Sequence, residues 1–283
     1  MNDIIKVSNL QKKFKQTIAL RDVSFEVKEG EIFGLLGPSG SGKTTTINIL
    51  TGQMESTSGS IEVLKRKEKE LTSSQFRSEI GVLSDNSTLY ERLTVYDNLK
   101  LFAKLYNASL EAIDEMLELV NMTEERQTVV SKLSKGMKQR ILLCKAIMHQ
   151  PKLAFLDEPT SALDPANIVH IHHGLKKLNE LGTTIFLTTH DMEEATKLCD
   201  RVAFLHKGEI KEIGNPIDLR YKYASEEFHI ETASGENLTL PNAPSSAEQI
   251  HSLISNEQLK QIHTDFPTLG EVFLQITGEE LEK

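Results

Sequence analysis

Nine consecutive residues in this sequence have the types and the spacing that bind phosphate groups. A Gly-rich loop lets the backbone approach phosphate oxygens closely, and the N-terminus of a following helix adds partial positive charge. Lys43 would supply a full charge for the β- and γ-phosphates, and the Thr44 hydroxyl suits Mg²⁺. The match to the pattern G-x-x-x-x-G-K-[ST] predicts that a nucleotide binds to Gly37, Pro38, Ser39, Gly40, Ser41, Gly42, Lys43, Thr44 and Thr45.

Two carboxylates and a histidine follow apolar runs that read as strands. Asp157 suits Mg²⁺ held through a water, and Glu158 suits polarising an attacking water. Two acids alone would mark only the end of a strand, but beside a phosphate loop they indicate phosphoryl transfer. His190 ends the next strand pattern. We expect it at the same edge of a parallel sheet, where it could hydrogen-bond a γ-phosphate or orient the water.

The segment 133–140 begins a helix and offers a second anion site. Ser134 is a favourable N-cap residue. Its hydroxyl, the Gly136 amide and the positive end of the helix dipole would together attract an anion. Taken by itself, the pattern of this segment indicates only the start of a helix.

The elements that must position these residues alternate between strand and helix patterns. Helical spacing covers 94–148, 165–181 and 191–199, whereas 65–79 is charged and predicts a loop. Strand patterns occur at 4–10, 23–27, 32–36, 61–63, 80–83, 153–156, 183–188 and 202–205. This alternation around a phosphate loop predicts an α/β fold with a mainly parallel sheet and a helical subdomain inserted at about 85–150.

The chain after residue 220 has a different pattern and a different charge. Residues 228–232 and 237–240 predict a hairpin, 247–254 predicts a helix, and Thr268 with Glu271 has the spacing of a capping box. From 225 to the end there are eleven acids and two bases, which equals the whole net charge of −9. We therefore expect a nucleotide-binding domain at 1–220 and a small α+β accessory region at 221–283 that binds no nucleic acid.

Composition narrows the class of protein. No run of about 18 apolar residues predicts a membrane span, and the first six residues lack the apolar segment of a signal peptide. Cys144 and Cys199 lie in apolar helical patterns, which favours reduced core residues in a protein of the cytoplasm over a disulfide or metal site. His170 and His173 share a helix face, and a solvated face is favoured there over a metal site.

In their order, these motifs resemble those of the ATPase subunit of the ATP-binding cassette (ABC) family, over residues 1 to about 220. The matching segments are the Walker A loop at 37–45, the signature motif at 133–140, the Walker B strand at 153–158, the D-loop at 161–164 and the switch histidine at His190. The resemblance implies a P-loop NTPase fold, binding of ATP with Mg²⁺, and hydrolysis of ATP to ADP and phosphate.

The resemblance also implies a role for individual residues. Phe14 would stack on adenine, Glu158 would be the catalytic base, and Asp164 of the D-loop would lie at the nucleotide. Ser134 and Gly136 would contact the γ-phosphate bound to another protomer. Two cassettes, in a homodimer or a heterodimer, would therefore enclose two ATP molecules.

Two positions depart from the pattern of the family. Asp85 stands where the family has a glutamine that ligates Mg²⁺, and it could still offer an oxygen beside Thr44 and Asp157. The signature motif has Lys135 and Met137 in place of the usual glycine and glutamine. We expect ATP hydrolysis to persist despite both departures.

The end of the chain resembles one branch of the family. Residues 263–278 resemble the ending of bacterial drug- and antibiotic-exporter ATPases of the ABC-2 type, and 87–99 has the exporter form near the groove that receives the membrane subunit. This implies a cytoplasmic ATPase on the inner face of the membrane, bound to a separate permease and powering export of a small molecule or peptide. The alternatives are a weak regulatory cassette of a heterodimer, or a soluble ABC ATPase acting on a macromolecule.

Overall fold

The computed structural model describes residues 2–84 and 86–279. Within them the chain divides into two compact units, the first ending at Gly214 and the second beginning at Asn215. Asp85, which was predicted as a ligand of Mg²⁺, lies outside the described residues.

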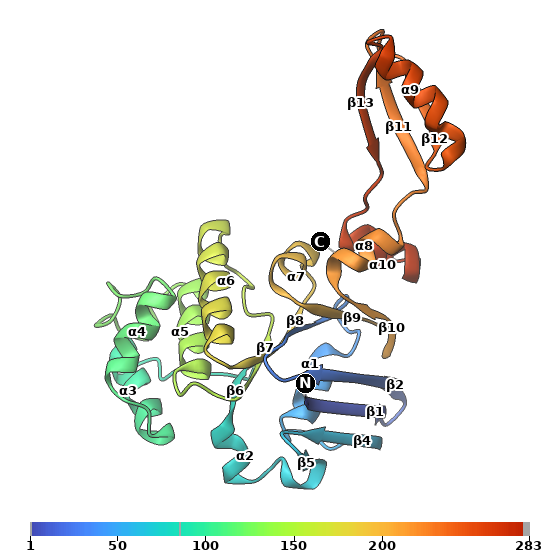
Figure 1. The fold of residues 1–283 in the computed structure, drawn as a ribbon. Helices are drawn as coiled ribbons and strands as arrows, with labels where there is room; N and C mark the ends of the chain where they lie inside the picture. The colour runs from blue at the N-terminus through green and yellow to red at the C-terminus, as the bar shows by residue number, and fades with distance from the viewer. Residues whose placement is uncertain (1, 85, 280–283) are drawn as a thin grey trace. The chain divides into compact units, whose positions relative to one another are not determined.

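The first unit is built on a ten-stranded sheet with the order β5-β4-β1-β2-β10-β9-β3-β8-β7-β6 (Figure 1). Its strands are β1 (Asp3–Phe14), β2 (Thr17–Lys28), β3 (Ile32–Leu36), β4 (Ser58–Val63), β5 (Arg66–Lys67), β6 (Ile80–Leu83), β7 (Leu153–Asp157), β8 (Thr184–Thr189), β9 (Arg201–His206) and β10 (Glu209–Gly214). The five strands β6, β7, β8, β3 and β9 run parallel.

The remaining part of the sheet is largely antiparallel. β1 pairs with β2 and β4, and β9 pairs with β10, all antiparallel. The pairs β1–β2 and β9–β10 follow from short connections, because only a crossover of a dozen or more residues can return a chain to a parallel neighbour. The parallel strands are the ones that carry the phosphate loop and the predicted catalytic residues.

Helices cover the sheet and form a separate group after β6 (Figure 1). They are α1 (Lys43–Leu50), η1 (Glu68–Glu70), α2 (Ser74–Glu79), α3 (Val95–Tyr106), α4 (Glu111–Leu119), η2 (Val130–Lys132), α5 (Lys135–Ile147), α6 (Pro165–Glu180) and α7 (Met192–Leu198). The group from α3 to α5 lies where helical spacing predicted helices.

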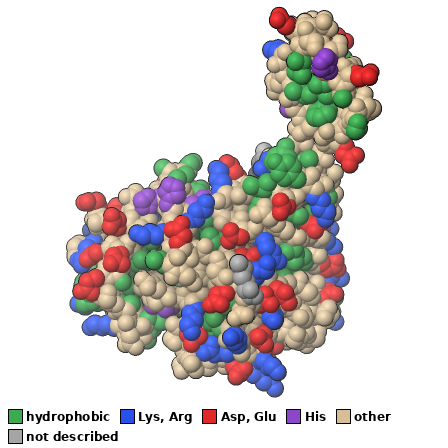
Figure 2. Space-filling view, in the orientation of Figure 1, with side chains coloured by type: hydrophobic (Ala, Val, Ile, Leu, Met, Phe, Trp, Pro, Cys, Tyr) green, Lys and Arg blue, Asp and Glu red, His purple; other side chains and the backbone are tan. Residues whose placement is uncertain are grey.

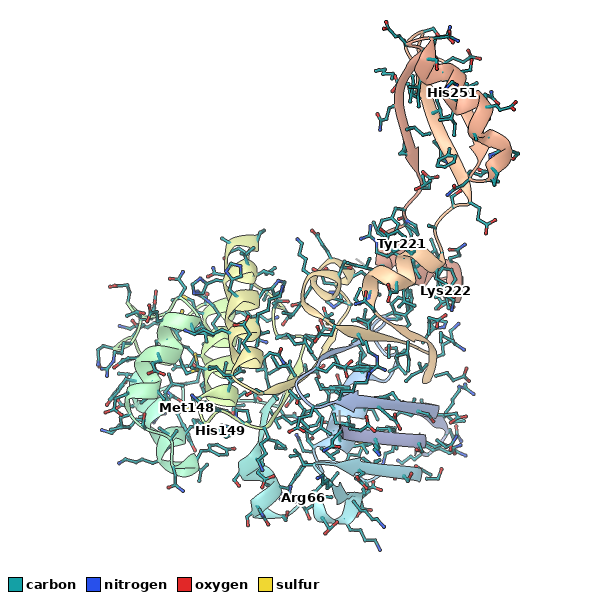
Figure 3. All side chains as sticks on the ribbon, viewed as in Figure 1. Arg66, Met148, His149, Tyr221, Lys222 and His251 are labelled. Carbon is teal, nitrogen blue, oxygen red and sulfur yellow. The ribbon has the colours of Figure 1, made fainter. Side chains whose placement is uncertain are left out.

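The prediction of a loop at 65–79 was wrong, because this segment forms β5, η1 and α2. Its only large apolar side chain within α2 is Phe76, which is fully buried. Arg66 donates two hydrogen bonds to Glu79, at 2.9 and 3.1 Å, and so joins β5 to the end of α2 (Figure 3). These hydrogen bonds hold the pKa of Glu79 below its usual range. Two buried side chains, Leu71 and Phe76, and one ion pair order a segment that has no apolar periodicity.

The core lies beneath the parallel strands. Phe33 on β3, Phe155 on β7 and Phe186 on β8 are fully buried, and the rings of Phe33 and Phe186 lie 5.8 Å apart. Cys144 and Cys199 are buried and free, as predicted, and burial raises the pKa of both thiols. This packing gives the loops at the carboxyl ends of the strands a rigid support.

The second unit is a three-stranded antiparallel sheet with short helices, and its strand order is β12-β11-β13. Its elements are α8 (Pro216–Lys222), β11 (Glu227–Thr232), β12 (Asn237–Pro241), η3 (Pro244–Ser246), α9 (Ala247–Ser255), β13 (Leu259–Thr264) and α10 (Leu269–Thr277). The hairpin, the helix at 247–254 and the capping box of Thr268 and Glu271 are confirmed.

The patterns also missed β10, β13 and α8. β10 and β13 are largely exposed or half-buried, so apolar residues do not alternate along them. α8 had a usable signal, since Asn215 caps it and Pro216 occupies its first turn. Within α8, the Tyr221 ring lies 4.6 Å from that of Phe266, on the segment before α10 (Figure 3).

Candidate functional site

The loop between β3 and α1 forms a cradle of backbone amides. Gly40 and Gly42 adopt φ of 76° and 115°, a region that favours glycine. Gly42 is the N-cap of α1, and no side chain caps this helix. The amides of the first turn of α1 are therefore free of a capping side chain and can donate to an anion. A phosphate group fits this cradle.

Lys43 places a positive charge inside the loop. Its Nζ donates to the carbonyl oxygens of Gly37 at 2.7 Å and Pro38 at 3.2 Å, and lies 3.5 Å from Glu158 Oε1. The side chain is nearly buried. A pocket of ≈ 420 Å³ opens over the loop and is lined also by Glu158, Ser161 and His190. The pocket therefore joins the predicted phosphate loop to the predicted catalytic residues.

Two oxygen atoms suited to a divalent cation meet beside the loop. Thr44 Oγ1 donates to Asp157 Oδ2 at 2.8 Å, which places a hydroxyl and a carboxylate next to each other. Thr188 Oγ1 donates to the other carboxylate oxygen of Asp157 and fixes its orientation. Mg²⁺ prefers hard oxygen ligands and commonly takes only one or two from the protein, with phosphates and waters completing the set. Thr44 and Asp157 fit that requirement.

Glu158 and His190 form a hydrogen-bonded pair. His190 Nδ1 lies 2.7 Å from Glu158 Oε2, so strands β7 and β8 bring the two side chains together as their common sheet edge predicted. Glu158 has a φ of 48°, an uncommon conformation for a residue with a side chain. Its amide donates to Thr188 O at 3.1 Å, and its carbonyl accepts from Gln139 Nε2 at 3.3 Å.

Thr188 and Gln139 were missed as contributors to the site. Thr188 ends the predicted strand at 183–188, two residues before His190, and Gln139 lies within the signature motif at 133–140. Their contacts with Asp157 and Glu158 join residues 31 and 19 positions apart, which no local pattern encodes.

The remaining predicted site residues lie elsewhere, and none of Phe14, Ser134, Gly136 and Asp164 lines this pocket. Phe14 is exposed, with Lys12 Nζ 5.0 Å from its ring. Ser134 caps α5, its Oγ accepting from the Met137 amide at 3.2 Å. A Cβ on Gly136 would lie 2.8 Å from the Ala162 carbonyl oxygen.

Asp164 caps α6 and accepts two hydrogen bonds from Asn167. These bonds hold the pKa of the Asp164 carboxyl below its usual value. Its carboxylate is therefore already hydrogen-bonded within its own chain. The pocket contains the phosphate loop and the catalytic pair, but not the predicted signature residues.

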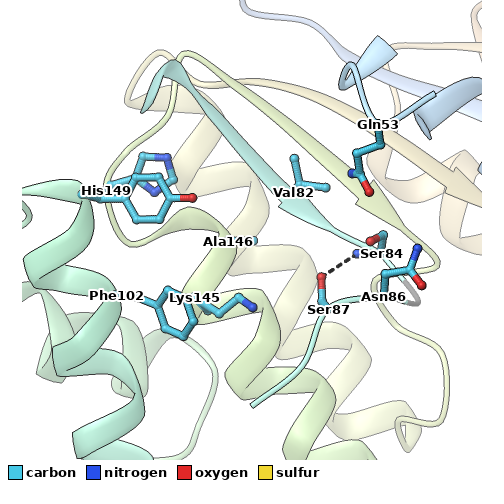
Figure 4. Close-up of a pocket in the computed structure, with 10 residues that line it drawn as sticks. Gln53, Val82, Ser84, Asn86, Ser87, Phe102, Lys145, Ala146 and His149 are labelled. Carbon is cyan, nitrogen blue, oxygen red and sulfur yellow. Dashed lines mark hydrogen bonds between the residues drawn. The ribbon is translucent and has the colours of Figure 1, made fainter. Parts of the chain in front are cut away.

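A second, smaller pocket of ≈ 240 Å³ lies between β6 and the helices α3 and α5 (Figure 4). Ser87 Oγ accepts from the Ser84 amide at 3.1 Å. Lys145 Nζ donates to the Thr88 carbonyl oxygen and lies 4.5 Å from the Phe102 ring. Burial lowers the pKa of Lys145. The pocket thus offers hydroxyls and a partly desolvated cation.

His170 and His173 are exposed on α6, and histidine side chains gather over that helix in Figure 2. His170 Nε2 lies 3.1 Å from the Glu118 carbonyl oxygen. The third histidine, His172, is buried and faces the other way. In the described residues no group of three or more His, Cys, Asp or Glu side chains is arranged to hold a metal ion.

Comparison with known proteins places this geometry among transport ATPases. The family model described as "ABC transporter" matches residues 20–161. A fluoroquinolones export ATP-binding protein of Mycobacterium tuberculosis is 36% identical over 290 residues, which cover 99% of this chain and 95% of the relative. The linearmycin resistance ATP-binding protein LnrL of Bacillus subtilis is 36% identical, over 83% of this chain and 76% of the relative.

Solved structures show the same fold. The dimeric post-hydrolysis state of the ATP-binding cassette MJ0796, bound to ADP and Pi, matches with a TM-score of 0.68 and 28% identity. That match covers 75% of this chain and 98% of the cassette. The ATP-binding subunit of an ABC transporter matches with a TM-score of 0.70 and 29% identity, over 78% of this chain and 93% of the subunit.

Proposed function

Because the chain belongs to the ABC transporter family and is an ATP-binding cassette with ATPase chemistry, we propose that it is the motor subunit of a drug exporter. The observation that carries the proposal is one pocket lined by Lys43, Thr44, Glu158 and His190, with Asp157 hydrogen-bonded to Thr44. It contains a charge for the phosphates, ligands for a cation and a base for water.

Each residue then has a physical task in hydrolysis. The loop amides and Lys43 would bind the phosphates of ATP, and Thr44 with Asp157 would hold Mg²⁺. When bound there, Mg²⁺ neutralises charge on the β- and γ-phosphate oxygens. Glu158 accepts the proton of the attacking water, and His190 orients the Glu158 carboxylate through Nδ1. ATP and water give ADP and phosphate.

Phosphate binding must also change the ion pair of Lys43. In the structure Lys43 Nζ lies 3.5 Å from Glu158 Oε1, so the predicted base is partly neutralised by the phosphate-binding cation. The more strongly charged phosphates would compete for Lys43 and release the Glu158 carboxylate to accept a proton. The base is therefore set free only when nucleotide is in place.

A second cassette completes the site. Ser134 and Gly136 do not line the pocket of their own chain, and the related cassette MJ0796 is dimeric. We propose that they reach the γ-phosphate held by another protomer, with Phe14 on the adenine and Asp164 close to the junction. The helix dipole of α5 would add positive charge at that phosphate.

Transport requires a membrane-spanning partner. No helix within residues 2–84 and 86–279 is long and apolar enough to cross a bilayer. We propose that the permease is a separate chain and that the pocket around Ser87 and Lys145 contacts it. The chain would lie on the inner face of the membrane. By the names of its relatives, the cargo would be a fluoroquinolone, linearmycin or a similar small molecule.

The proposal is tested by purifying the tagged chain from detergent-extracted membranes of its own cells. We expect a polytopic membrane protein to copurify, and inverted vesicles to accumulate a fluorescent fluoroquinolone when ATP is added. Glu158→Gln should retain the membrane partner and lose the transport. Recovery of the chain without a membrane protein, or transport that is unchanged in Glu158→Gln, would contradict it.

A further inference from the structure

A buried carboxylate joins three segments beside the catalytic pair. Glu194, in the first turn of α7, is 3% exposed. Its Oε1 accepts from Thr160 Oγ1 at 2.7 Å and lies 3.2 Å from His172 Nε2 on α6. Thr160 and His172 are themselves 8% and 7% exposed. The three polar groups therefore meet within the protein, away from solvent.

This cluster is not needed to pack the helix. Met192, Ala195 and Leu198 already give α7 an apolar buried side, and an apolar side chain at position 194 would continue it. Burying a carboxylate costs free energy unless it is paired and hydrogen-bonded. Within the described residues Glu194 Oε2 has no hydrogen-bond partner, so part of that cost is not offset. A carboxylate buried at such a cost indicates that it is needed to fix the positions of the groups bonded to it.

The cluster connects the segments that carry Glu158 and His190. Thr160 lies two residues after Glu158, in a turn where the Ser161 amide donates to the Glu158 carbonyl oxygen at 3.1 Å. Asp191 directly follows His190 and caps α7, and its Oδ1 accepts from the Glu194 amide at 2.9 Å. The hydrogen bond between Thr160 and Glu194 therefore links the turn after Glu158 to the helix after His190.

The backbone of Glu158 makes such support necessary. Its φ of 48° is sparsely populated for residues with a side chain, and a strained residue keeps its conformation only where its surroundings fix it. Thr188 accepts from the Glu158 amide, and Gln139 donates to the Glu158 carbonyl oxygen. Thr160 is the next polar attachment along the turn, and its partner is Glu194.

We propose that Glu194 is a positioning residue for ATP hydrolysis. Its carboxylate, bonded to Thr160 and His172, fixes the turn of Glu158 against the helix of His190 and so sets the 2.7 Å contact between the catalytic pair. Glu194 touches no substrate and acts only through these neighbours. The inference rests on the roles proposed above for Glu158 and His190.

The first experiment measures steady-state hydrolysis and the binding of a fluorescent ATP analogue. Thr160→Val removes the hydroxyl and keeps the shape, and should lower kcat about 10- to 100-fold with unchanged KM and Kd, because a small misplacement of a catalytic group slows chemistry rather than binding. Thr160→Ser restores the hydroxyl and should recover most of kcat. Thr196→Val is the matched control, since among residues 2–84 and 86–279 the Thr196 hydroxyl on α7 bonds only to the Met192 carbonyl oxygen.

A second readout does not depend on hydrolysis. Hydrogen exchange of the Ser161 amide, which is bonded to the Glu158 carbonyl oxygen, reports how firmly the turn is held. In nucleotide-free protein, Thr160→Val should speed this exchange about 10-fold, the effect of losing one hydrogen bond. Amides of β7 should exchange as in the wild-type protein, and Glu194→Gln should lie between Thr160→Val and wild type.

The two readouts separate the possible failures. If Thr160→Val leaves both kcat and Ser161 exchange unchanged, Glu194 has no positioning role. The same conclusion follows if Thr196→Val lowers kcat equally, or if KM and Kd rise together with the loss of kcat. If the wild-type protein hydrolyses no more ATP than Glu158→Gln, the proposed catalytic function fails, and the exchange of Ser161 alone decides whether the turn is held by Glu194.

Discussion

Replacing Gly37 by alanine tests whether the shape of the phosphate loop sets ATPase activity. A Cβ at this position would lie 2.1 Å from the carbonyl oxygen of Leu205 and 2.8 Å from Ser41 Oγ, whereas ordinary contacts begin at 3.4 Å. The Leu205 carbonyl oxygen belongs to the backbone of β9 in the central sheet and cannot yield. The phosphate loop must therefore move by about 1 Å. A displacement of that size at a site that positions reactants lowers kcat/KM about 100-fold.

The assay combines steady-state hydrolysis with thermal unfolding. Gly30→Ala is the matched control, because Gly30 lies in the turn before β3 with φ +79° and its Cβ would meet nothing within 4 Å. Its backbone strain of about 1 kcal/mol should lower the unfolding midpoint by about 2–4 °C and leave kcat/KM unchanged. The reasoning is refuted if Gly37→Ala hydrolyses ATP at the wild-type rate, or if Gly30→Ala loses activity to the same extent.

Three further predictions follow from the same contacts. Glu158→Gln should abolish hydrolysis and retain or tighten ATP binding, because Lys43 loses its ion pair; weaker binding in a nucleotide titration would contradict this. The hydrogen bonds from Arg66 lower the pKa of Glu79, so the stability that they add is present above the usual pKa of 4.5 and is lost as pH falls through the lowered pKa. In Glu79→Gln the unfolding midpoint should therefore fall less steeply at acid pH than in the wild-type protein. Phe76→Ala should cost about 3–5 kcal/mol in denaturant unfolding, since Phe76 is fully buried; a cost below 1 kcal/mol would show that α2 is not anchored by it.

The residues that a motif places in one loop, or at one edge of a parallel sheet, could be predicted from the sequence. Lys43 and Thr44 belong to one local pattern, and Asp157, Glu158 and His190 converge because the carboxyl ends of β7 and β8 meet. The buried pairing of Glu194 with Thr160 joins residues 34 positions apart and leaves no periodic signal. Such contacts depend on how distant segments of the chain pack together, which cannot be read from the pattern of a single sequence.

The elements that were missed have a common physical reason. α2 contains one buried apolar residue, Phe76, and β13 is exposed along most of its length, so neither shows an amphipathic period. The role proposed for Ser134 at a nucleotide came from the resemblance to the family, because the pattern of its own segment indicates only the start of a helix. In the structure its hydroxyl caps α5, and in our proposal another protomer brings ATP to it.

The central claim is that each ATP site combines the phosphate loop of one protomer with the signature motif of another, and mixing two inactive variants tests it most directly. Lys43→Met removes the charge of the loop. Ser134→Asp keeps an N-cap for α5 but sets a negative charge against the γ-phosphate. If two copies pair, a mixed dimer has one site with both defects and one intact site. Random pairing should therefore restore about one quarter of the wild-type ATPase rate. A mixture as inactive as either variant alone would contradict the account.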